Sequence, residues 1–179
     1  MRQRQAGVTW LRKVLVWGFV MGAISVGVFH QGTVFLLFHH GHRIPELTTW
    51  LGRVPGPGWN LAQTMPAFGQ PGWPIPQFVN GMFWGGLWGI VIAAALRWSR
   101  WPDLLTGFLV GAIGCVGVAV TLVAALKGLP LFAGGNTQAL ARAALVNGAF
   151  GWGAALLMRP VEVRGFNPLP VRPAGAARL

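Results

Sequence analysis

The sequence is poor in charged residues, and acidic ones are nearly absent. Charged side chains make up 9% of the 179 residues, and only three of them are acidic; soluble domains use roughly 25% charged residues. The three acids are Glu46, Asp103 and Glu162, and they are so far apart in the sequence that no pair of catalytic carboxylates is expected. No Ser-His-Asp set can be assembled either. No catalytic residue is predicted, although acid–base work by His30 with Arg142 and Glu46 stays open as an alternative.

Cysteine and histidine are also scarce, which limits the cofactors that the chain could hold. The single cysteine, Cys115, lies in an apolar run, so neither a disulfide framework nor a cysteine metal site is expected. Histidine is absent after residue 42, and a haem with two axial histidines would need His30 from two protomers. Three further histidines form a weak transition-metal candidate, with interfacial polar residues as the alternative: His39, His40 and His42. No cofactor is predicted.

The sequence contains long runs of apolar residues. The first run, residues 14–38, would extend roughly 37 Å as a helix, enough to cross a hydrocarbon core of about 30 Å. Three more runs follow, at residues 76–97, 104–126 and 137–158. The sequence therefore predicts an all-α integral membrane protein with four transmembrane helices. The net charge of +11 is spread over both ends and the connections, so nucleic acid is not an expected partner.

The remaining segments are predicted from proline content and charge. Residues 39–75 form a proline-rich outer loop and residues 127–136 a short outer loop, while residues 98–103 form a cytoplasmic connection. Residues 1–13 are a basic cytoplasmic N-terminus, and residues 159–179 a disordered basic tail. Ten of the 14 lysines and arginines fall on the side of the two termini. Because cytoplasmic segments carry the excess of basic residues, both termini are expected in the cytoplasm.

Two pairs of helices resemble each other in sequence. Residues 18–24 match residues 107–113 at five of seven positions, and residues 79–83 match residues 146–150 at four of five. The order is kept, so we predict two tandem hairpins that run parallel in the membrane. Parallel repeats are one of the architectures that transporters use.

Glycines recur at four-residue spacing in the predicted helices. Small residues at this spacing let membrane helices approach closely, within one chain or between chains. The predicted packing glycines are Gly18, Gly22, Gly81, Gly85, Gly89, Gly107 and Gly111.

Polar side chains inside the apolar runs form the candidate site. Polar groups at membrane depth should face protein or water, because contact with lipid is costly. The expected cluster lies in the outer half of the membrane and comprises His30, Gln31, Thr33, Asn80, Asn147 and Arg142. Two interpretations remain open, a structural hydrogen-bond network between helices and a binding pocket that opens to the outer side.

Several short motifs resemble a known group of proteins. They are residues 29–32 (Phe-His-Gln-Gly), 83–89, 126–128 and 145–148, together with the proline-rich loop. The chain resembles small, uncharacterised four-helix inner-membrane proteins of proteobacteria over residues 14–158. The resemblance implies the four-helix architecture and a location in the bacterial inner (plasma) membrane, and it implies no activity.

The function expected from the sequence is non-enzymatic. The leading hypothesis is an integral membrane protein that packs through its glycine faces, with itself as a homo-oligomer or as an accessory subunit of a larger inner-membrane complex. The first alternative is a small transporter or channel with its polar site in the outer half. The second is a metal or haem carrier. Apart from such protein partners, the lipid bilayer is the expected partner.

Overall fold

The computed structural model describes residues 10–67 and 70–163. Four helices are long and apolar enough to cross a membrane: Trp10–Arg43, Gln77–Trp98, Asp103–Leu126 and Thr137–Val161. The protein is thus mostly helical, as predicted, and its helices fit a multi-pass membrane protein. Much of the predicted cytoplasmic N-terminus and nearly all of the predicted disordered tail lie outside the described residues.

The first helix is one continuous rod that is longer than predicted. It contains α2 (Gly18–Ser25) and α3 (Gln31–His40), joined and preceded by wider π-type turns, and it ends in a 3-10 turn, Gly41–Arg43. Gly41 has a right-handed conformation, with a φ of −59°. The chain turns at Ile44, which is extended, and Pro45 begins α4 (Pro45–Leu51). Proline suits this position because the first turn of a helix leaves its N–H groups without helical partners.

The other three long helices begin and end close to the predicted residues. They are α5 (Gln77–Trp98), a third rod containing α6 (Asp103–Leu109), α7 (Val116–Val118) and α8 (Ala124–Leu126), and α9 (Thr137–Met158). Gly128 ends the third rod with φ +64°, as a glycine cap does. Thr137 is the first residue of α9, and Asn136 caps the helix by accepting a hydrogen bond from the Ala139 N–H at 2.9 Å.

The proline-rich loop contains the exception to the predicted all-α fold. Strands β1 (Thr64–Ala67) and β2 (Gln70–Pro76) pair as an antiparallel hairpin with an irregularity between Pro66 and Ala67. The proline content of this segment argues against a central strand. A two-stranded hairpin has only edge strands, and edge strands tolerate proline because one side of each makes no ladder hydrogen bonds.

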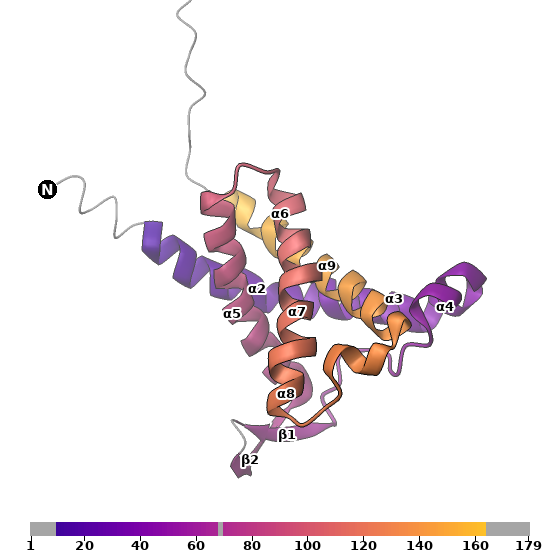
Figure 1. Ribbon diagram of the computed structural model, residues 1–179. Helices are drawn as coiled ribbons and strands as arrows, with labels where there is room; N and C mark the ends of the chain where they lie inside the picture. Colours follow the sequence, from indigo (N-terminus) through magenta and orange to yellow (C-terminus); the bar gives the residue numbers. More distant parts are fainter. Residues whose placement is uncertain (1–9, 68–69, 164–179) are drawn as a thin grey trace, which may run out of the picture.

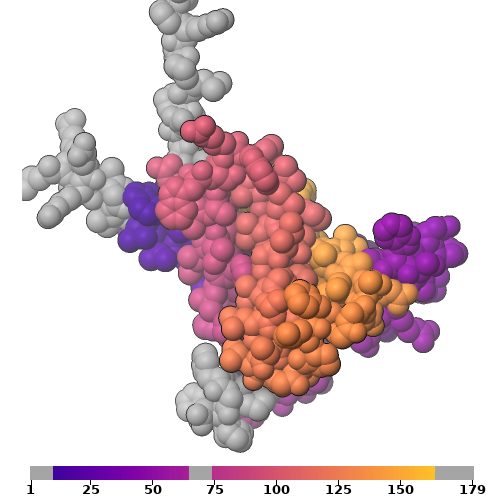
Figure 2. Space-filling model, viewed as in Figure 1, coloured from indigo at the N-terminus to yellow at the C-terminus, as the bar shows by residue number. Residues whose placement is uncertain are grey.

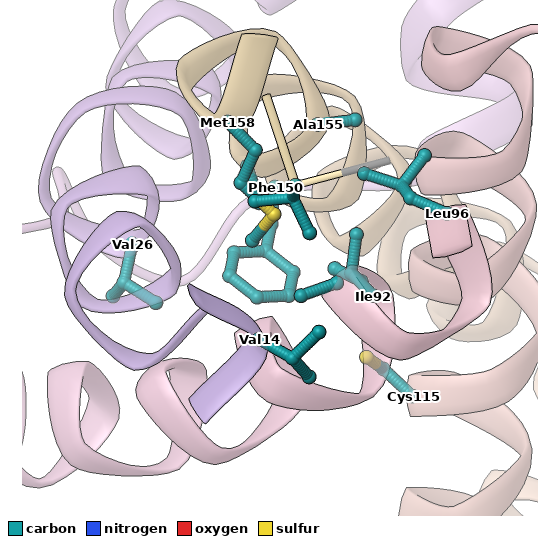
Figure 3. Close-up of a cluster of buried hydrophobic side chains, with 11 residues drawn as sticks. Val14, Val26, Ile92, Leu96, Cys115, Phe150, Ala155 and Met158 are labelled. Atoms are coloured by element: carbon teal, nitrogen blue, oxygen red, sulfur yellow. The ribbon is translucent and has the colours of Figure 1, made fainter. Parts of the chain in front are cut away.

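In Figure 1 the first helix runs across the view toward α4, whereas α5 and the third rod run down toward the hairpin. At one end the first helix, α5 and α9 contribute Val14, Leu96 and Met158 to a single apolar core. Ile92 and Phe150 belong to the same core and lie close to one another (Figure 3). The opposite ends of the helices, which we call the loop end, carry α4 on the right of Figure 1 and the hairpin at its bottom. The segment after α8 also lies there and covers much of the lower part of the molecule in Figure 2. The described residues nearest to the two termini therefore lie at the same end.

Glycine contacts join the helices in two pairs. A methyl group added at Gly22 would overlap the carbonyl of Gly85 and the backbone of Gly89. One added at Gly111 would overlap the carbonyl of Asn147 and approach Gly151. The first helix thus packs backbone to backbone on α5, and the third rod packs likewise on α9.

The outcomes for the predicted packing glycines follow from these contacts. Gly18, Gly22, Gly85, Gly89, Gly107 and Gly111 each lie closely against the partner helix of their pair. Gly81 does not, since a methyl group there would stand 3.8 Å from Val26 Cγ1 in ordinary contact. The glycine faces are therefore occupied within the chain.

Candidate functional site: a polar cavity at the loop end

A cavity of about 760 Å³ lies at the loop end of the helices. The first helix, the segment after α4, α5, the turn after α8 and α9 all contribute to its walls. We call it the polar cavity, and its polar side chains are His30, Gln31, Asn60, Gln63, Gln77, Asn80, Lys127, Arg142 and Asn147. Its volume falls within the range of roughly 300–1,000 Å³ that is usual for small-molecule sites.

The first helix contributes His30 and Gln31. The side-chain amide of Gln31 donates to His30 Nδ1 at 3.3 Å, and Gln31 Oε1 accepts a hydrogen bond from the backbone N–H of Trp59 at 2.9 Å. The indole N–H of Trp59 donates to the carbonyl of Gly27 at 2.9 Å. Gln31 therefore holds the proline-rich loop against the first helix, as well as lining the cavity.

The opposite wall is fixed by α9. Arg142 Nη1 donates to the carbonyls of Leu51 at 2.7 Å and Arg53 at 3.0 Å, and the Gln138 amide donates to the carbonyl of Thr49 at 3.0 Å. These carbonyls belong to the end of α4 and the residues after it. The loop is thus tied to α9 on one side and to the first helix on the other, and residues 54–63 form a wall between them.

Five of the six predicted cluster residues line this one cavity: His30, Gln31, Asn80, Arg142 and Asn147. Thr33 is not among the residues that line it. The predicted interhelical network of hydrogen bonds is not found for Asn147, whose amide donates to the Ala143 carbonyl of its own helix at 2.9 Å. His30, Gln31 and Asn147 are all partly buried.

Sequence reasoning missed several residues of the site. The hydropathy pattern of the sequence places Lys127 at the end of a helix and gives it no other role. It places Asn60 and Gln63 in the proline-rich loop, and Gln77 where that loop joins the next helix. Their role depends on the loop folding back over the helices, where the Gln77 N–H donates to the Gln63 carbonyl at 2.9 Å. The number of asparagine and glutamine side chains among the prolines is a sequence signal for a polar site. Whether these side chains face the helices depends on the hairpin, which the sequence does not predict.

The charge of the cavity is of one sign. Among the described residues that line it, Lys127 and Arg142 are basic and none is acidic. Lysine and arginine side chains are ordinarily cationic at neutral pH. The remaining polar groups are amides and one imidazole, which can donate or accept hydrogen bonds. This arrangement can bind a small polar solute, and it favours a negative one.

The three histidines at the end of the first helix do not form a metal centre. The rings of His39 and His40 lie 6.5 Å apart, and His39 packs against Phe35 and Phe38. Within residues 10–67 and 70–163, no three His, Cys, Asp or Glu side chains are grouped so that they could hold a metal ion.

The chain was compared with protein-family models, curated proteins and solved structures. No family model, no curated protein and no solved structure matches it. The resemblance to small four-helix inner-membrane proteins stays a prediction.

Proposed function

We propose that this protein is an integral membrane protein that binds a small anionic solute in the polar cavity. The observation that carries the proposal is the composition of the walls, where polar side chains from three of the long helices and the loop converge. Lys127 and Arg142 are among them, and no acid is found among the wall residues that the structure describes. Polar residues placed within membrane helices are costly to bury and are by default functional candidates.

The apolar core beyond the cavity supports binding over free passage. Farther along the helices from the cavity, Ile92 is fully buried and Phe150 and Met158 are nearly so. An apolar core of this kind offers no polar partner to a solute that leaves the cavity. The proposed cycle therefore has the solute enter at the loop end and bind, with any transport requiring the helix pairs to move relative to each other.

Self-association through the glycine faces, the leading expectation from the sequence, has less support. Those faces pack on each other within the chain, so a second copy would have to displace an intramolecular contact. An accessory role in a larger complex is compatible with solute binding, but no feature of the described residues specifically supports it.

We also propose that the chain arose from two copies of one helix hairpin, with both termini in the cytoplasm of a bacterial cell. Gly18 and Gly22 pack on α5 as Gly107 and Gly111 pack on α9, and Phe19 covers Gly86 as Phe108 covers Gly148. These contacts favour matching residues 85–89 with residues 147–151, five residues away from the match expected from sequence alone. The excess of lysine and arginine near the termini supports the orientation.

Thermal unfolding of the purified protein in detergent tests the proposed solute binding. The probes are inorganic phosphate, succinate and, as a cation of similar size, choline, each titrated at constant ionic strength. Phosphate or succinate should raise the unfolding temperature in a saturable way, because a ligand that binds only the folded state stabilises it. Choline should leave the temperature unchanged.

Two lysine variants provide the matched comparison. Lys127→Gln removes a charge from the cavity, whereas Lys13→Gln removes the same charge at the far end of the first helix. The anion-dependent stabilisation should be lost in the first variant and kept in the second. An equal response to choline, or an equal loss in both variants, would overturn the proposal.

A further inference from the structure

A second cavity, of about 690 Å³, lies between the end of the first helix and α4. We call it the boundary cleft. Its apolar walls are formed by Leu37, Phe38, Leu47, Leu51 and Val54. Its polar side chains are His42, Thr48 and Arg53, and within residues 10–67 and 70–163 no acidic residue lines it. The boundary cleft is therefore amphipathic, with a basic edge.

The position of the boundary cleft along the first helix places it at the edge of the membrane. The apolar run of that helix ends at Phe38, and His39, His40, His42 and Arg43 follow within five residues. Such a change from apolar to polar residues marks the level at which hydrocarbon gives way to lipid headgroups. Trp50, on the adjacent α4, is 74% exposed, and tryptophan is enriched at this level of the bilayer.

We propose that the boundary cleft binds one anionic phospholipid, with the phosphate beside Arg53 and His42 and the first part of an acyl chain along Leu37 and Leu47. A guanidinium group matches the oxygens of a phosphate in charge and in geometry. The apolar walls would be left in contact with water by a free phosphate ion, whereas a lipid chain covers them. Both halves of the cleft therefore fit a single amphiphilic molecule.

The backbone around Arg53 is held in place before any ligand arrives. Arg142 donates from Nη1 to the Arg53 carbonyl at 3.0 Å and to the Leu51 carbonyl at 2.7 Å. A site that is ordered in advance loses less entropy when it binds. Leu51 and Val54 are each only 8% exposed, so the wall that carries Arg53 is packed into the molecule.

The proposal goes beyond the solute binding proposed above, because the two cavities are distinct. Val54 and Pro55 line both and form the partition between them. Lys127 lines only the polar cavity, and Arg53 lines only the boundary cleft. Failure of one proposal would therefore leave the other standing.

Native mass spectrometry tests the lipid site. The full chain is reconstituted in vesicles of phosphatidylcholine with a minority of phosphatidylglycerol of the same acyl chains, and then released in mild detergent. The parent protein should retain one phosphatidylglycerol per chain and no excess of phosphatidylcholine. Arg53→Gln should weaken retention about tenfold, as expected for the loss of a charged hydrogen-bonding partner.

Arg43→Gln is the matched control, because Arg43 lies next to His42 but does not line the cleft. It should keep the bound lipid. A second pair guards against misfolding: Thr48→Glu places an acid in the cleft and should expel the lipid, whereas Thr49→Glu should not. Equal loss in Arg43→Gln, equal retention of phosphatidylcholine, or displacement of the lipid by inorganic phosphate would each overturn the proposal.

Discussion

Single glycines decide how closely the paired helices approach. The Cβ of an alanine at position 22 would meet backbone atoms of Gly85 and Gly89, which cannot rotate away as a side chain can. Gly117 offers the opposite case, because nothing lies within 4 Å of an added methyl group there. Gly22→Ala should therefore cost about 1–3 kcal/mol of stability through overpacking. Gly117→Ala should be neutral or stabilise by up to about 1 kcal/mol.

Unfolding in detergent, followed by circular dichroism, measures both glycine variants under the same conditions. The informative quantity is the difference between them, since both add one methyl group to a helix. If the two variants unfold alike, the close contact between the first helix and α5 is not present in solution.

Trp59 is a second residue whose role can be isolated. Its indole N–H donates to the Gly27 carbonyl, and its ring lies 5.5 Å from that of Phe35. Trp59→Phe keeps an aromatic ring and removes the donor, so it should cost about 0.5–1.5 kcal/mol. Trp50→Phe, at a site 74% exposed, should change the stability in detergent little. Equal effects in the two variants would show that the hydrogen bond to the first helix contributes nothing.

At the scale of elements, the loop depends on α9 for its position. Arg142 and Gln138 supply three hydrogen bonds to carbonyls of residues 49–53. Arg142→Met keeps a long side chain but removes two of these bonds, so the loop should open more often than the helices. Hydrogen exchange should therefore quicken in residues 49–60, while α5 and the third rod keep their protection.

The control for the loop is Arg159→Met, which removes an arginine just after α9. It should leave exchange in residues 49–60 unchanged. Faster exchange over the whole chain in Arg142→Met would instead mean that this arginine stabilises the entire fold.

The helices are more predictable from the sequence than the loop, and the reason is physical. Hydropathy alone sets which segments can lie in lipid, so α5 and α9 lie within a residue or two of their predicted bounds. The hairpin depends on pairing that proline rules argue against. The four-residue spacing of the glycines predicts close packing but does not identify the packing partners. The spacing therefore predicts a close contact at Gly81, whereas the structure has one at Gly86, against Phe19.

The candidate site is predictable in part for the same reason. Polar residues in an apolar helix must turn toward protein or water, and this rule alone places His30, Asn80 and Asn147 in one group. Lys127 is not in that group, because its place in the cavity depends on the loop that follows α8. Cavity residues within the apolar helices can therefore be predicted from the sequence, whereas those whose position depends on the loop conformation cannot.

At the scale of the whole molecule, the proposed orientation can be tested with single cysteines. Leu129 lies at the loop end and is 56% exposed, whereas Trp101 lies at the other end and is 58% exposed. Cys115 is buried and should react little with a bulky reagent, so it can be kept. In intact bacterial cells, an impermeant maleimide should label Leu129→Cys, and Trp101→Cys only after the membrane is opened. The described ends of the first helix and α9 lie at the same end of the molecule as Trp101. Labelling of Trp101→Cys in closed cells would therefore place both termini outside, opposite to the orientation that the basic residues favour.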